Sequence, residues 1–100
     1  MANDDSRVIE IACGAIAQRQ RLALAYKDDI RIVDPYMVGY DAQGRLWLSA
    51  VQIMGGSGPG FRSYAAEDIA SLAMTEEKFV PDHPDYNPRD RMFARVLCQI

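Results

Sequence analysis

Gly44-Arg-Leu-Trp-Leu-Ser-Ala-Val-Gln-Ile-Met-Gly-Gly-Ser-Gly-Pro-Gly-Phe-Arg-Ser-Tyr64 is the stretch on which the rest of the chain is organised. Its alternation of side chains predicts a strand over residues 45–53 and a second strand over 61–64. Both faces of the first strand are partly apolar, which suits a small barrel with a helix laid over part of it. The glycine-rich segment 55–60 between the strands lacks both the Walker and the Gly-x-Ser-x-Gly patterns. It is therefore interpreted either as a hairpin connector or as a loop that contacts a ligand.

The segment before this stretch predicts one helix and several short strands. Apolar residues recur at helical spacing from Arg7 to Arg19, after three candidate N-caps, Asp4, Asp5 and Ser6. Strand patterns follow over 21–26, 30–33 and 36–40, separated by a charged turn at 27–29. Pro35 lacks an amide donor, so we expect an edge-like strand with a kink or a bulge there. Residues 41–44 form a predicted hairpin turn.

The segment after this stretch is predicted to be less regular. A helical turn at 65–68, a strand over 69–74 and a charged turn at 75–78 precede a proline-rich linker at 81–86. Asn87 and Pro88 then resemble the start of a last helix, although residues 88–100 fit a strand as well. An apolar stripe at helical spacing supports the helix; its members are Met92, Phe93, Val96, Leu97 and Ile100. The whole chain, residues 1–100, is interpreted as one mainly β, α+β domain.

Composition excludes several classes of protein. The formal net charge of −3 disfavours strong non-specific binding to duplex nucleic acid. Cys13 and Cys98 lie far apart in apolar contexts with no metal-type spacing, so we expect two buried, reduced thiols. The N-terminus has no basic region or apolar segment of a leader, and no apolar run is long enough for a membrane span. These features predict a cytoplasmic protein without a membrane partner.

The chain resembles a WYL domain over about residues 8–80. The residues that carry the resemblance are Ala15-Ile16, Leu22, Tyr26, Arg31-Ile32-Val33-Asp34-Pro35-Tyr36, Gly44-Arg45-Leu46-Trp47-Leu48-Ser49-Ala50, Phe61-Arg62-Ser63-Tyr64, Ile69 and Phe79. The resemblance implies a short helix followed by a small, five-stranded SH3-like or Sm-like β-barrel, with residues 81–100 as a C-terminal extension that ends in a helix. It also implies a regulatory or sensor module that binds negatively charged ligands, such as nucleotides or single-stranded nucleic acid.

The candidate ligand-binding residues are arginines and aromatic residues of the predicted strands: Arg31, Arg62, Tyr26, Tyr36, Trp47 and Tyr64. Arg62, beside an aromatic residue and the glycine-rich loop, is suited to clamp a phosphate bidentately. The alternative for Arg62 is a salt bridge to Glu67 or Asp68, and for Arg31 a solvated strand face. Tyrosine hydroxyls can bind a ligand and Trp47 can stack on a base, whereas packing is the alternative for these aromatic residues.

The sequence predicts no catalysis, metal or cofactor. Ser57 has no histidine nearby to activate it, and His83 is expected to be solvated in the linker. The alternative to ligand binding is a non-catalytic interaction or homo-oligomerisation module. In that case the C-terminal apolar stripe would be its docking element.

Overall fold

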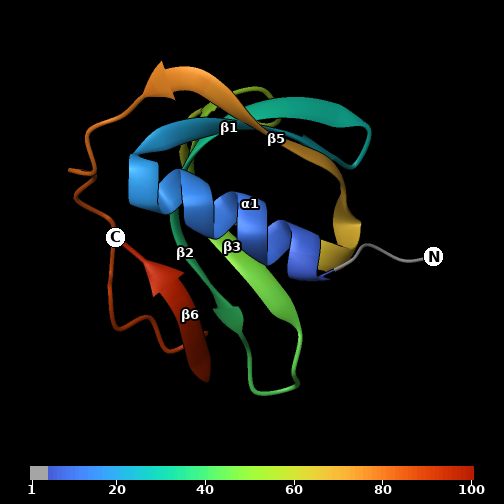
Figure 1. Ribbon diagram of the computed structural model, residues 1–100, viewed down its shortest axis with the longest axis vertical. Coiled ribbons are helices and arrows are strands. Elements are labelled where there is room, and N and C mark those ends of the chain that lie inside the picture. The colour runs from blue at the N-terminus through green and yellow to red at the C-terminus, as the bar shows by residue number, and fades with distance from the viewer. Residues whose placement is uncertain (1–4) are drawn as a thin grey trace.

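The computed structural model describes residues 5–100 as one helix and six strands (Figure 1). The elements are α1 (Asp5–Gln18), β1 (Gln20–Tyr26), β2 (Asp29–Tyr40), β3 (Leu46–Met54), β4 (Gly60–Ala65), the 3₁₀ turn η1 (Ala66–Asp68), β5 (Ile69–Lys78) and β6 (Arg95–Gln99). The predicted α+β, mainly β class is therefore confirmed. The candidate cap Asp4 lies outside the described residues. The predicted turn at 75–78 is wrong, because β5 continues through it and pairs Lys78 with Gln20 of β1.

The strands form one antiparallel sheet in the order β4-β3-β2-β1-β5, and β6 pairs with β2. The first half of β2 pairs with β1 and the second half with β6, while β3 runs along its other side. The predicted edge position of this strand is therefore wrong. The predicted bulge is confirmed, since the register with β3 shifts between Pro35 and Met37. The shift falls where proline has no amide hydrogen to donate.

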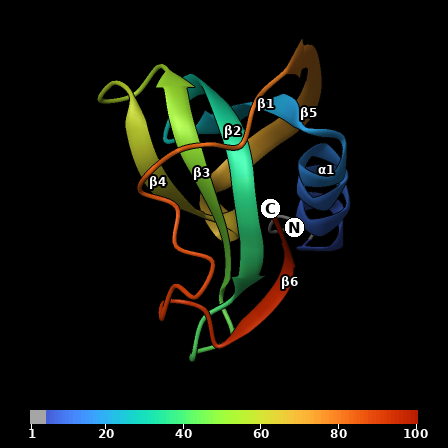
Figure 2. The same cartoon turned by 90° about the vertical axis from the view of Figure 1, so that its left-hand side faces the viewer.

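The two faces of the sheet carry different layers. Helix α1 covers one face, and the chain between β5 and β6 crosses the other face (Figure 2). Buried Val8, Ala12 and Ile16 of α1 pack with apolar residues of the strands in the main core. On the far face, Tyr36, Val51 and Phe79 form a smaller core. Both faces of β3 are buried because of these two layers, as its sequence predicts.

The predicted closed barrel does not form. Within residues 5–100, the sheet ends at β4 and β5, which are not hydrogen-bonded to one another. The sheet nevertheless curls, because the rings of Tyr26 on β1 and Tyr64 on β4 lie 5.1 Å apart although β2 and β3 separate their strands. Strands β1 and β4 are therefore in contact through their side chains, although no backbone hydrogen bonds close the sheet into a barrel.

The predicted C-terminal helix is wrong, and residues 95–99 form β6 instead. The strand lies against the second half of β2, which β1 has left unpaired on that side. Gly39 allows this approach, because a side chain there would meet the carbonyl oxygen of Arg95 and the ring of Phe93. The apolar residues of the expected docking stripe are mostly used inside the fold. Phe93 is buried, and Leu97 and Ile100 pack against the cores.

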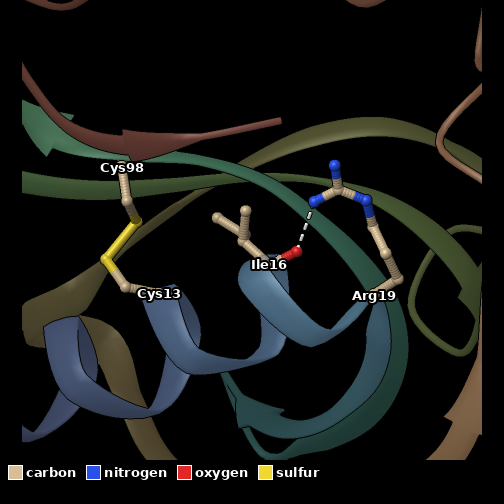
Figure 3. Close-up of a disulfide and its surroundings, with 4 residues drawn as sticks. All are labelled: Cys13, Ile16, Arg19 and Cys98. Carbon is tan, nitrogen blue, oxygen red and sulfur yellow. Dashed lines mark hydrogen bonds between the residues drawn. A yellow bond between two sulfur atoms is a disulfide. The ribbon is translucent and has the colours of Figure 1, made fainter.

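Cys13 and Cys98 form a disulfide, so the prediction of reduced thiols is wrong (Figure 3). The two residues are 85 positions apart, but α1 lies against β6 and brings their Cα atoms to 5.8 Å. Disulfides are characteristic of oxidising compartments, whereas the cytoplasmic location was inferred partly from reduced thiols. That location stays a prediction. No helix in the described part of the chain has the length and apolar character needed to cross a membrane.

Candidate functional site

Four of the six candidate residues meet beside the glycine-rich loop. Tyr26, Arg31, Arg62 and Tyr64 come from β1, β2 and β4, and Arg31 lies 5.2 Å from the centre of the Tyr26 ring. The sheet curl brings these strands together, and the alternation along each strand places the side chains on one face. We call this group, together with Gln52, the arginine site. Whether it binds a ligand stays a prediction.

Gln52 joins the parts of the arginine site, and sequence reasoning missed it. Its side-chain oxygen accepts hydrogen bonds from the hydroxyl of Tyr64 at 2.7 Å and from Arg31 at 3.3 Å. Its side-chain nitrogen donates to the carbonyl oxygens of Gly55 at 2.8 Å and Gly58 at 2.6 Å. A fully buried glutamine with four partners is a structural anchor for the loop. The signal in the sequence was a large polar residue between Val51 and Ile53 of a mainly apolar strand.

Arg31 lies beneath the loop. A side chain at Gly56 would come within 2.9 Å of both the guanidinium of Arg31 and the amide of Gln52, so only glycine leaves room there. The Gly56 amide itself donates to Asp29 at 2.6 Å, which holds the outer side of the loop. The Nε atom of Arg31 is buried without a hydrogen-bond partner among the described residues. A buried donor of a cation left in this state is costly and is rare in folded proteins.

Arg62 lies against the other side of the loop. Its guanidinium donates to the hydroxyl of Ser57 at 3.3 Å and to the carbonyl oxygens of Gly58 and Pro59, both at 3.4 Å. These are long hydrogen bonds, which a stronger acceptor can replace. The alternative salt bridge from Arg62 to Glu67 is wrong, because Glu67 pairs with Arg45.

The arginine site has an excess of positive charge. Among residues 5–100, no carboxylate lies within 4.0 Å of the guanidinium of Arg31 or Arg62. Burial raises the pKa of Tyr64, although the positive charges of Arg31 and Arg62 oppose that shift. The Tyr64 hydroxyl is therefore protonated at neutral pH and donates a hydrogen bond to Gln52. Two guanidiniums on different sides of one loop, neither paired with a carboxylate in the described chain, are suited to hold an anion.

Trp47 lies away from the arginine site. Its indole nitrogen donates to the carboxylate of Asp41 at 2.8 Å, and Arg45 lies 5.0 Å from its ring centre. Asp41 also accepts the backbone amides of Arg45 and Gln43. The hydrogen bond from Trp47, followed by those from these amides, lowers the pKa of the Asp41 carboxyl. Trp47 therefore supports the 41–45 turn, which agrees with the packing alternative for this residue.

Tyr36 lies on the opposite face of the sheet. Its ring packs against Phe61, Phe79 and Tyr86 at centroid distances of 5.0 to 5.8 Å. Its hydroxyl accepts the backbone amide of His83 at 3.1 Å, which fixes the linker to the sheet. His83 is half-buried rather than solvated as predicted, and its ring lies 5.7 Å from that of Phe61.

Asp34 is a buried carboxylate next to Tyr36, and sequence analysis gave it no role of its own. It is 7% exposed and accepts a hydrogen bond from Arg21 at 2.8 Å. Burial raises the pKa of Asp34 above its ordinary value of 3.8, although Arg21 opposes the shift. The signal available in the sequence was a charged residue directly after the predicted strand 30–33 and before Pro35.

The raised pKa of Asp34 predicts a pH dependence of stability. A carboxyl that binds its proton more tightly when folded stabilises the fold at low pH. We expect that contribution to be lost as the pH rises from 3.8 through the raised folded value. The Asp34→Asn variant should therefore lose less stability than the wild type between about pH 3 and about pH 7 in urea unfolding. The other carboxyl groups contribute equally to both chains, so parallel curves would contradict the prediction.

Within residues 5–100, no three or more His, Cys, Asp or Glu side chains are grouped so as to hold a metal ion. Comparison with known proteins gives no relative: no family model, no curated protein and no solved structure matches this chain.

Proposed function

We propose that this chain is a non-catalytic, regulatory ligand-binding module of the WYL kind, and that it binds a small phosphate-bearing anion at the arginine site. The ligand would be a nucleotide or the phosphate of a nucleic-acid strand. The observation that carries the proposal is the pair Arg31 and Arg62, which lack a carboxylate partner in the described chain. The curl of the sheet, which brings Tyr26 and Tyr64 into contact, gathers the residues of the site.

The contacts of the arginine site suggest how an anion would be held. The amides and carbonyl groups of residues 55–60 lie between the two guanidiniums. Four of these six residues are glycines, and glycine lets the backbone come close to a ligand. Arg62 would exchange its long bonds to the loop for charge-assisted bonds to phosphate oxygens. Arg31, stacked on Tyr26 and bonded to Gln52, would supply a fixed second cation.

Binding at this site should depend on Arg62. We expect Arg62→Ala to weaken the binding of AMP and of pyrophosphate by roughly tenfold to a hundredfold, since a hydrogen bond to a charged group contributes about 1.5–3 kcal/mol. The fold should be retained, because Arg62 is half-exposed and donates only to the hydroxyl of Ser57 and to the carbonyl oxygens of Gly58, Pro59 and Phe61. Isothermal titration calorimetry at low and high salt measures both the affinity and its electrostatic component.

Arg45→Ala is the matched control, since Arg45 is an exposed arginine that pairs with Glu67 at another end of the sheet. It should bind both anions as the wild type does. Adenosine is the neutral control ligand and should not compete with pyrophosphate. Wild-type affinity in both Arg62→Ala and Arg31→Ala would show that the site is assigned wrongly. Trp47 fluorescence is not a suitable readout, because Trp47 lies away from the arginine site.

A further inference from the structure

A cavity lies on the opposite face of the sheet from the arginine site. It has a volume of about 490 Å³, within the roughly 300–1,000 Å³ that is usual for small-molecule sites. Its floor is made by Val51 and Ile53 of β3, and Phe79 and His83 from the segment after β5 form a wall. We call it the linker cavity, because four of its lining residues belong to the chain between β5 and β6: Phe79, Val80, Asp82 and His83. That chain crosses this face of the sheet (Figure 2).

Two polar side chains of β2 face the linker cavity with unused hydrogen-bonding capacity. The hydroxyl oxygen of Tyr36 accepts the amide of His83, but its own proton has no acceptor within residues 5–100. One carboxylate oxygen of Asp34 accepts from Arg21, whereas the other has no donor in the described chain. Asp34 and Tyr36 are two positions apart and thus on the same face of the strand. The cavity therefore presents one donor and one acceptor on the same face of the sheet.

The charges around the linker cavity balance. It is lined by two basic side chains, Arg21 and Lys78, and by two acidic ones, Asp34 and Asp82. The Nδ1 atom of His83 accepts the amide of Asp85 at 3.2 Å, which leaves the proton of the neutral ring on Nε2. The carboxylate of Asp34 is already paired with Arg21 at 2.8 Å. The four charges of the lining sum to zero, whereas the arginine site has an excess of positive charge.

From this geometry we infer that the linker cavity is a second binding site, which takes a small neutral molecule with an aromatic body and a carboxamide-like edge. The amide N–H donates to Asp34 and the amide oxygen accepts the proton of Tyr36. The body of the molecule packs on Val51, Ile53 and Phe79. This inference is independent of the proposed function, since none of these residues belongs to the arginine site.

The test is a titration of the full ¹⁵N-labelled chain with benzamide, followed by NMR. Benzamide has the required edge on a single ring, and a fragment of its size binds an adequate site with a Kd of about 1 mM. Saturable shifts are expected for the amides of Ile53, Phe79 and His83. Benzoate and benzylamine keep the ring but carry opposite charges, and both should bind at least about fivefold more weakly. The absence of saturable shifts in these amides, or equal binding of benzoate, would overturn the proposal.

Two variants test separately the hydrogen-bonding groups of the linker cavity and its free volume. Tyr36→Phe keeps the ring and removes the donor, so benzamide should bind about fivefold to tenfold more weakly. This change also removes the acceptor of the His83 amide, so it could alter the linker as well. The second variant therefore leaves every polar group of the cavity in place. Ile53→Phe fills the cavity from β3 and should abolish the shifts, while its unfolding curve shows that the chain is folded. The Arg62→Ala chain, altered on the other face, should bind benzamide like the wild type. Wild-type binding by both Tyr36→Phe and Ile53→Phe would overturn the assignment.

Discussion

Removal of the Cys13–Cys98 disulfide is expected to lower the free energy of unfolding by about 4–5 kcal/mol. The bond closes a loop with a sequence separation of 85 residues, and a link of this length strongly restricts the unfolded chain. The bond also links α1 to β6 (Figure 3), the strand that pairs with β2. For a domain with a total stability of roughly 5–15 kcal/mol, this is a major fraction. Urea unfolding of the wild type with and without reductant measures the change.

The Cys13→Ala/Cys98→Ala double variant is the control for this measurement. Its unfolding midpoint should equal that of the reduced wild type, apart from a small packing change, and should not respond to reductant. A thiol assay on the denatured, unreduced wild type gives an independent result. Two free thiols per chain, together with equal midpoints for all samples, would contradict the disulfide and restore the prediction of reduced cysteines.

Replacement of Gln52 by leucine is expected to cost about 2–4 kcal/mol of stability and to loosen the glycine-rich loop. Leucine has a similar size but no polar atoms. The change leaves the buried hydroxyl of Tyr64 without an acceptor and the carbonyl oxygens of Gly55 and Gly58 without their donor. Chemical unfolding measures the loss of stability, and amide hydrogen exchange in residues 55–60 measures the loosening.

Gln43→Leu is the matched control, because Gln43 is an exposed glutamine in the 41–44 turn. It should change the stability by no more than about 0.5 kcal/mol. If the proposed function is correct, Gln52→Leu should also weaken pyrophosphate binding, since Arg31 loses its partner. A Gln52→Leu chain as stable as Gln43→Leu, with unchanged exchange in the loop, would show that Gln52 is not the anchor described above.

The elements formed by neighbouring residues could be predicted because their signals are local. The helical spacing from Arg7 onwards led to α1, and strand alternation with glycine-rich turns led to β3, β4 and the loop between them. The bulge at Pro35 could be predicted because proline lacks a donor wherever it lies. Four residues of the arginine site were also proposed from the sequence, since their strands could be recognised.

The C-terminal segment could not be predicted because its pattern fits two structures. The apolar residues from Met92 to Ile100 have helical spacing, yet β6 forms because the second half of β2 lacks a partner on one side. This side of β2 is free to pair with β6 because β1 pairs with β2 only as far as Val33. Gly39, which lets β6 approach, lies about 55 residues away in the chain and gives no signal for this role.

The sequence by itself therefore determined the mainly β class, the N-terminal helix and the two strands around the glycine-rich loop, because periodicity and turn chemistry act between residues a few positions apart. The tertiary structure decided the disulfide, β6, the role of Gln52 and the linker cavity. Their partners come from distant parts of the chain, as with Cys13 and Cys98, and only the curl of the sheet and its two covering layers bring them together.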